Sequence, residues 1–417
     1  MLQNRLMALW QQICRKWECV KTAWSEDSGM YAHRRLARMT RMLKKRLEET
    51  YEFRHNVLDG TTECRCIGQK DAGFQAVDRR MLNRIMEEMR LKGVAPVKSD
   101  VQMMVLSEEV PAYHPFRAYL SALPEWDGQD RVTELLARVS GDAFWLSTAR
   151  KWMRAMVSQW GGLPRTHANV LTPVLISRRQ GMGKSTFARM LLPECLRMYY
   201  LDSLSLNAAF RPEQKLARMG LVNLDEFDRL GERQQALLKN LLQLMDIPLY
   251  RGKELGWVHA PRLASCIATT NSLQFLTDGT GSRRFLCVEV ERPIPQTPIN
   301  YEQLYAQLWK EACAGLPDYL TPREEGELQH RNLIYYRSSP LEELLRTYYR
   351  LPSPEEEGIW LTAMEIFRQL HAENPASLRG STPRQVSLCL GNLGFRMVHR
   401  NIGNCWLVQR RAKEGSL

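Results

Sequence analysis

Residues 171–192, LTPVLISRRQGMGKSTFARMLL, constrain the fold of this chain more than any other stretch. The apolar residues 174–176 are typical of a short strand that is buried on both faces of a parallel sheet. Residues 185–192 have apolar side chains at helical spacing. A glycine-rich turn joins the two segments. Strand, turn and helix in this order predict a phosphate-binding loop within an α/β domain.

The residue types in this loop suit the binding of a nucleotide such as ATP. Gly181 and Gly183 allow backbone conformations that a Cβ atom disfavours, so successive N–H groups can point at phosphate oxygens. Lys184 would reach the β- and γ-phosphates, and the Ser185 hydroxyl would bind Mg²⁺. We expect the nucleotide to contact a contiguous set of residues: Gln180, Gly181, Met182, Gly183, Lys184, Ser185 and Thr186.

The loop departs from the full pattern G-x-x-x-x-G-K-[ST] at one position, where Arg178 replaces the first glycine. The alternative interpretation is an ordinary glycine-rich turn whose lysine is solvated. The strand and helix around the turn favour the nucleotide site, because the N-terminal end of a helix adds partial positive charge.

An acidic pair follows the apolar residues 221–224. Asp225 would orient Mg²⁺ and its water, and Glu226 would polarise the attacking water in a nucleotide-hydrolysing site. The simpler alternative is an acidic pair that ends a strand and begins a helix. Because the pair follows the Lys-Ser loop in the same chain, the catalytic interpretation is favoured.

Two further polar motifs adjoin predicted strands. Asn271 follows the apolar segment 262–270, where it would sense the γ-phosphate or position water; an Asn-Ser turn is the alternative. Arg283 and Arg284 lie on a Gly-Ser loop before the predicted strand 286–290. Paired arginines there suit an arginine finger that stabilises a transferring phosphoryl group, although a solvated basic turn explains them equally.

The charge of the chain bears on its partners. A formal net charge of +12 predicts an anionic partner, most simply nucleic acid, although a soluble basic surface also explains it. Residues 247–259 predict a hairpin whose tip carries Arg251 and Lys253. Residues 33–46 are densely basic with Leu and Met interleaved; a solvated helix face and a polyanion-binding arm both remain open.

Cysteine usage and hydropathy bear on location. The ten cysteines show neither a disulfide framework nor zinc spacing, which indicates a reduced protein. No uninterrupted stretch approaches the ~20 apolar residues of a membrane span, and the N-terminus lacks the pattern of a signal peptide. We therefore expect a cytoplasmic protein that does not associate with membranes.

Composition and turn signals divide the chain into five regions. The last is expected to contain two helices followed by a β-hairpin, an order like that of a winged helix; a small packing or oligomerisation module is the alternative. The five are a helical and hairpin N-terminal region (1–109), a helical lead-in (110–168), the nucleotide-binding core (169–292), a helical segment (293–350) and a small C-terminal domain (351–417).

Four motifs, taken in order, resemble the virulence-associated protein E family: QGMGKSTF (180–187), NLDE (223–226), ATTN (268–271) and GSRRF (281–285). Proteins of that family are P-loop ATPases, often carried by prophages and mobile elements, and are similar to superfamily-3 helicases of the AAA+ class. The resemblance covers residues 110–290 well. The tail resembles an accessory domain appended to versions from Bacteroides-like bacteria.

The resemblance implies a role for each matched residue. Lys184 and Ser185 would contact ATP and Mg²⁺, and Asp225 and Glu226 would form the metal-site and water-activating pair. Asn271 would be the sensor. Arg283 or Arg284 would be an arginine finger that completes the nucleotide site of a neighbouring subunit. Lys253, helped by Arg251, would contact DNA in a central channel.

Three functions remain open. The first is an ATP-driven DNA helicase or translocase of a phage or mobile-element replication system. It would bind single-stranded DNA as a homo-oligomeric ring such as a hexamer, beside other replication proteins. The second is an ATP-dependent loader or a regulatory or defence switch that binds DNA or a partner without unwinding. The third is a nucleotide-binding scaffold without catalysis, which Arg178 favours slightly and Glu226 disfavours. No priming activity is expected, because residues before 100 carry no zinc ligand set or acidic cluster.

Overall fold

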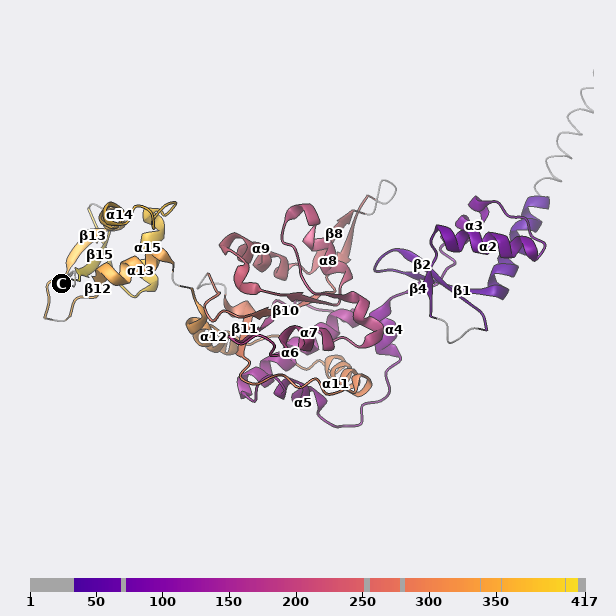
Figure 1. Ribbon diagram of the computed structural model, residues 1–417, viewed down its shortest axis with the longest axis horizontal. Coiled ribbons are helices and arrows are strands. Elements are labelled where there is room, and N and C mark those ends of the chain that lie inside the picture. Colours follow the sequence, from indigo (N-terminus) through magenta and orange to yellow (C-terminus); the bar gives the residue numbers. More distant parts are fainter. Residues whose placement is uncertain are drawn as a thin grey trace, which may run out of the picture. The chain divides into compact units, whose positions relative to one another are not determined.

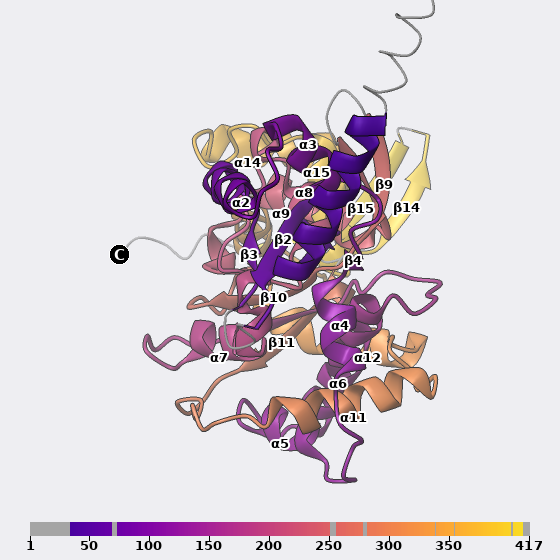
Figure 2. The ribbon, with the colours of Figure 1, turned by 90° about the vertical axis from the view of Figure 1, so that its right-hand side faces the viewer.

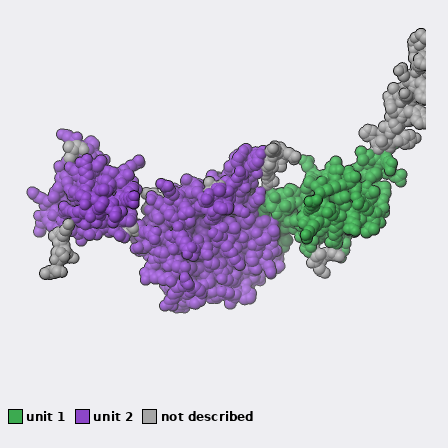
Figure 3. All heavy atoms as spheres, turned by 45° about the horizontal axis from the view of Figure 1, so that its top comes forward, with its two compact units in different colours: residues 1–122 green, residues 123–417 purple. Residues whose placement is uncertain are grey.

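The computed structural model describes residues 34–68, 73–250, 256–277, 282–337, 339–353, 355–401 and 403–411. The chain forms two compact units, residues 1–122 and 123–417, which Figure 3 shows in green and purple. Among the helices in these described ranges, none combines the length and the apolar composition of a membrane span.

The first unit packs helices against a small sheet. A helix over residues 34–50 leads into β1 (Tyr51–Asn56), and a turn that contains Asp59 and Gly60 reverses the chain into the antiparallel β2 (Thr61–Cys66). The sheet order is β3-β2-β1-β4, so a hairpin is present, as predicted for this region, and two short strands extend it. Its other elements are β3 (Gln75–Ala76), α2 (Arg79–Leu91), α3 (Lys98–Val105), β4 (Ala112–Tyr113) and α4 (Pro115–Ser121).

A five-stranded parallel sheet of order β11-β5-β10-β7-β6 forms the centre of the second unit. The β5, β7 and β10 strands are buried along their whole length, as their apolar sequences predicted for a sheet covered on both faces. The chain is therefore a mixed α/β protein. The five strands are β5 (Thr172–Ile176), β6 (Tyr200–Leu201), β7 (Leu221–Leu224), β10 (Ser265–Thr270) and β11 (Phe285–Glu289).

Helices cover both faces of this sheet (Figures 1 and 2). On one face lie α5 (Arg131–Ala137), α6 (Ala143–Gly161) and α11 (Tyr301–Cys313), and on the other α8 (Pro212–Arg218) and α9 (Glu232–Gln243). The α8 helix begins at Pro212, because proline favours the first turn of a helix.

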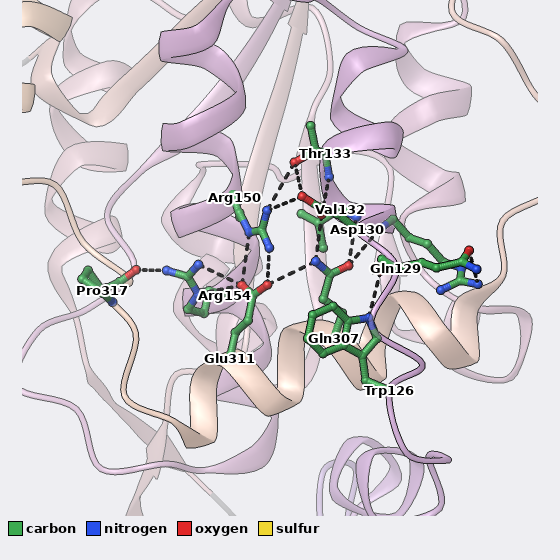
Figure 4. A network of polar contacts seen from close by, with 11 residues as sticks. Trp126, Gln129, Asp130, Val132, Thr133, Arg150, Arg154, Gln307, Glu311 and Pro317 are labelled. Carbon is green, nitrogen blue, oxygen red and sulfur yellow. Dashed lines mark hydrogen bonds and ion pairs between the residues drawn. The ribbon is translucent and has the colours of Figure 1, made fainter.

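A polar network joins α5, α6 and α11 (Figure 4). Glu311 of α11 accepts hydrogen bonds from both Arg150 and Arg154 of α6, and the distance from Arg154 Nη2 to Glu311 Oε2 is 2.8 Å. Gln307 Nε2 donates to Glu311 at 3.2 Å and to Asp130, the N-cap of α5, at 2.8 Å. Arg150 also pairs with Asp130. These contacts hold three helices in register beneath the sheet.

A hairpin beside the sheet and the helical segment 293–350 were both predicted. The β8 (Asp246–Tyr250) and β9 (Trp257–Pro261) strands pair antiparallel, which confirms the predicted hairpin. The helical segment contains α11, which ends at Cys313 and is followed by Gly315 with φ +71°. It continues with α12 (Pro322–Arg331) and α13 (Pro340–Tyr348).

The C-terminal part of the second unit has its own apolar core, built around Leu345, Ile366, Leu390 and Trp406. The two predicted helices and the hairpin are present, and an additional strand, β13, pairs with β15. The elements after α13 are β12 (Tyr349–Arg350), β13 (Ile359–Thr362), α14 (Ala363–Glu373), α15 (Pro383–Asn392), β14 (Met397–Arg400) and β15 (Gly403–Arg410).

Candidate nucleotide site

The glycine-rich loop connects β5 to α7 (Lys184–Met190). Gly181 and Gly183 adopt φ of +75° and +79°, and a Cβ atom on Gly183 would lie 3.4 Å from the carbonyl oxygen of Ile294. Ile294 N donates to Met182 O at 3.0 Å, which holds the loop from its far side. Gly183 is therefore favoured by its left-handed backbone conformation, which residues with a Cβ rarely adopt.

Arg178, the departure from the loop pattern, does not disturb this arrangement. Its side chain is exposed, and its backbone does not adopt a positive φ. An L-residue is therefore tolerated at this position without strain.

A cavity of about 270 Å³ opens at the loop, at the C-terminal ends of β5, β7 and β10. Because these strands are parallel, their C-terminal ends meet at one edge of the sheet and bring distant sequence motifs together. The lining comprises all seven predicted loop residues and five others: Gln180, Gly181, Met182, Gly183, Lys184, Ser185, Thr186, Asp225, Glu226, Thr269, Thr270 and Asn271.

Lys184 is the only lysine in this lining, and its side chain is largely buried. Its Nζ donates to Asn271 Oδ1 at 2.8 Å and to Ser177 O at 3.4 Å. Burial lowers the pKa of the Lys184 ammonium, while the charges of Asp225 and Asp228 act in the opposite direction. An ammonium fixed in this way faces the cavity with fewer contacts to solvent, which strengthens its attraction to an anion.

Asp225 joins the loop to the sheet. Its Oδ1 accepts a hydrogen bond from Ser185 Oγ at 3.2 Å and another from Thr269 Oγ1. Thr270 Oγ1 donates to Asp228 Oδ1 at 2.7 Å. Sequence reasoning assigned no role to Thr269, Thr270 or Asp228, although the two threonines stand directly before Asn271 at the end of a buried strand, which was the available signal.

Glu226 lines the cavity in an unusual backbone conformation. Its φ of +53° is left-handed, which is rare for a residue other than glycine or asparagine, and such strain is concentrated at functional sites. Its carboxylate lies 2.7 Å from Arg229 Nη1 in a pair whose two side chains are largely exposed. The predicted water-activating group is therefore held by a local ion pair at the rim of the cavity.

The predicted arginines lie elsewhere. Arg283, in the 3₁₀ turn Ser282–Arg284, pairs with Glu325 of α12 at 3.1 Å, and Arg284 is half-buried beside it. Neither lines the described cavity of its own chain. Arg251 and Lys253, predicted to contact nucleic acid, lie outside the described residues, as does Gly281. Their roles stay predictions.

The described side chains bear on metal binding and on the cysteine prediction. In the parts of the chain that the structure describes, no group of three or more His, Cys, Asp or Glu side chains is arranged to hold a metal ion. Ser185 Oγ and Asp225 Oδ1 nevertheless lie side by side and offer two oxygen ligands. Mg²⁺ prefers oxygen ligands, and in nucleotide sites phosphate oxygens supply some of the others. The described cysteines all carry free thiols.

Comparison with known families identifies the chain. The model of the virulence-associated protein E-like domain matches residues 120–333, about half of the chain, and includes the cavity and all of its lining residues. The chain belongs to the virulence-associated protein E-like family. A second model, a domain of unknown function described from B. theta (DUF3874), matches residues 338–408. No curated protein matches the sequence.

Among solved structures, two apo forms of the C-terminal region of NrS-1 are similar to this chain. One shares 14% identity, covers 73% of this chain and 78% of the matched chain, and has a TM-score of 0.39. The other shares 11% identity, covers 88% of this chain and 97% of the matched chain, and has a TM-score of 0.41.

Proposed function

We propose that this protein is a P-loop ATPase that couples ATP hydrolysis to movement on DNA in the replication of a phage or mobile element. One observation carries the proposal: the buried Lys184 is hydrogen-bonded to Asn271 beside the Ser185–Asp225 pair, all at one cavity. Residues from three separate strand ends thus converge where the glycine-rich loop would cradle phosphates.

The sheet supports the assignment to the AAA+/superfamily-3-like class. With its five parallel strands numbered in chain order, the sheet runs 5-1-4-3-2. The strand followed by Asn271 therefore lies between the strand before the loop and the strand before Asp225. That order lets a single residue such as Asn271 contact the loop lysine while Thr269 contacts the metal-site carboxylate.

Each side chain at the cavity would have its own role in ATP hydrolysis. Lys184 and the loop N–H groups would neutralise phosphate charge, and Asn271 would hold Lys184 in place or sense the terminal phosphate. Glu226 would accept the proton of the attacking water after its carboxylate turns from Arg229. Ser185 and Asp225 would hold Mg²⁺, which when bound neutralises developing charge on the phosphates.

The partners follow from charge and from the position of the arginines. Arg283 and Arg284 lie away from their own cavity, which suits a finger offered to the nucleotide site of a neighbour in a homo-oligomeric ring. The formal charge of +12 favours DNA as the polyanion, with Lys253 and Arg251 at the hairpin tip as backbone contacts and other replication proteins beside it. We propose that the C-terminal part is a winged-helix-like module and that the protein is cytoplasmic.

The alternative function is an ATP-dependent loader or a regulatory switch that does not unwind DNA. The ion pairs of Arg283 with Glu325 and of Glu226 with Arg229 favour it, because they engage two groups that a constitutive motor would keep available. A partner protein that separates these pairs would then turn hydrolysis on.

Steady-state hydrolysis of Mg-ATP by the full chain, with and without single-stranded DNA, tests the proposal, with Lys184→Ala as the inactive reference. Hydrolysis that DNA stimulates and Lys184→Ala abolishes supports the motor. Hydrolysis that responds to a partner protein and not to DNA supports the loader or switch. Nucleotide binding without hydrolysis under any of these conditions would contradict both and leave the scaffold.

A further inference from the structure

The β8–β9 hairpin has one buried and one exposed face. Ile247 and Leu249 are almost fully buried and belong to the same apolar core as Leu216 and Ala217 of α8. Val258 and Ala260 of β9 also pack against that core, and the alternation along both strands places the other side chains on the outer face. That face consists of Asp246, Pro248, Tyr250, Trp257, His259 and Pro261.

Two aromatic side chains stand opposite each other on this outer face. Tyr250 and Trp257 are cross-strand partners whose ring centroids lie 5.6 Å apart with an interplanar angle of 56°. Their exposed fractions are 42% and 67%. Leaving this much aromatic surface in water forgoes the stabilisation that burial provides, which marks the pair as a surface that a partner covers.

We propose that Tyr250 and Trp257 stack against the bases of a single-stranded nucleic acid. This inference rests on the nucleic-acid part of the function proposed above and names the contact that would hold the substrate. Every base has a π-face, so an exposed aromatic pair binds strands of any sequence. Two exposed cationic residues belong to the segment that packs on the buried face of β8: Lys215 of α8 and Arg211, which precedes that helix. Their charge adds to the excess of basic residues in the chain, which favours a polyanion as the partner.

A second copy of the chain fits this face less well. A stable interface between copies buries about 800 Å² per partner around an apolar centre. On the described outer face of the hairpin, the four side chains beside the aromatic pair are an aspartate, a histidine and two prolines, so the apolar part of the face is small. Two rings with so little apolar surface around them match a strand of bases better than they match a flat protein surface.

The test measures binding of a labelled oligo(dT) to the full chain by fluorescence anisotropy, without nucleotide, between about 50 and 200 mM salt. Trp257→Leu keeps an apolar side chain and removes the π-face, so we expect affinity to fall about 5- to 150-fold at every salt concentration, with the salt slope unchanged. Trp257→Phe should retain most of the affinity. Lys253→Ala should instead reduce the salt slope. Tyr319→Leu, which alters an exposed aromatic residue in the segment after α11, on the other face of the sheet from α8, is the matched control.

Each result decides the matter. Wild-type affinity in Trp257→Leu, or an equal loss in Tyr319→Leu, overturns the stacking surface. A lower oligomer mass for Trp257→Leu by light scattering overturns it in favour of contact between copies. If the wild type itself does not bind oligo(dT), the nucleic-acid part of the proposed function fails as well. The ATPase part is judged separately, because the Lys184→Ala comparison needs no DNA.

Discussion

Two polar clusters of the second unit differ in how completely their hydrogen bonds are satisfied. In the α5–α6–α11 network, Glu311 accepts bonds from two arginines and from Gln307, and its side chain is 7% exposed. At the cavity, Lys184 has one close partner, Asn271, and Asp225 accepts from two hydroxyls that line the same cavity. The network is closed, whereas the cavity cluster faces open space.

This difference distinguishes a polar cluster that stabilises the fold from one that can bind a ligand. A buried charge whose lone pairs are all engaged fixes the helices around it and offers nothing to a ligand. A half-satisfied cluster on a cavity costs stability and retains donors and acceptors for a ligand. Substitutions in the network should therefore change the free energy of unfolding, and substitutions at the cavity should change hydrolysis.

The largest effect is expected for Glu311→Gln. Removing the charge leaves the buried Arg154 without a counter-charge and leaves Arg150 with Asp130 alone, which should lower the free energy of unfolding by about 3–5 kcal/mol. Urea denaturation followed by tryptophan fluorescence measures it. Glu327→Gln, which breaks the exposed pair with Arg331, is the matched control and should stay within about 0.5 kcal/mol of the wild type. If Glu311→Gln and Glu327→Gln lowered the free energy of unfolding equally, the closed network would be no more important for stability than an exposed ion pair.

Asp225→Asn should show the opposite behaviour. An amide keeps an oxygen for Ser185 and Thr269 but loses the charge that would hold Mg²⁺, so hydrolysis should fall about 100- to 1,000-fold. The Mg²⁺ concentration for half-maximal hydrolysis should rise in parallel, while the urea midpoint should hardly move. A destabilisation as large as that of Glu311→Gln would show that Asp225 is primarily structural.

The sequence alone predicted the loop, the carboxylates and Asn271 as one cluster because parallel strands end at a common edge. It did not predict the contacts of Thr269 or Asp228, because a hydroxyl within an apolar strand has no pattern of its own. Nor did it predict the network: Arg150 and Glu311 are 161 positions apart in sequence, and only the packing of α6 on α11 brings them together. The roles of the cavity residues stay predictions.

Acid should weaken the closed network. Burial by itself raises the pKa of Glu311, but hydrogen bonds from Arg150 and Arg154 outweigh it and hold that pKa below the usual 4.5. The unfolded chain therefore binds more protons as the pH falls below about 4.5, and stability is lost towards the lower folded pKa. Between those values the wild type should lose up to ~1.4 kcal/mol per pH unit more than Glu311→Gln. Parallel curves of unfolding free energy against pH would contradict this.

The smallest effect is expected for Arg229→Ala at the rim of the cavity. The side chains of Arg229 and Glu226 are 74% and 49% exposed, so solvent screens their pair and its loss should change stability by less than about 0.5 kcal/mol. Without Arg229, the Glu226 carboxylate should turn towards the cavity more often and raise the rate of hydrolysis about two- to fivefold. This limit follows from the small free energy of an exposed ion pair. Arg346→Ala, which removes an exposed pair with Glu342 in the C-terminal part, controls for general effects of charge. If Arg229→Ala instead destabilised the protein as the loss of a buried pair does, the Glu226 turn would be part of the scaffold, and its positive φ would have a structural cause.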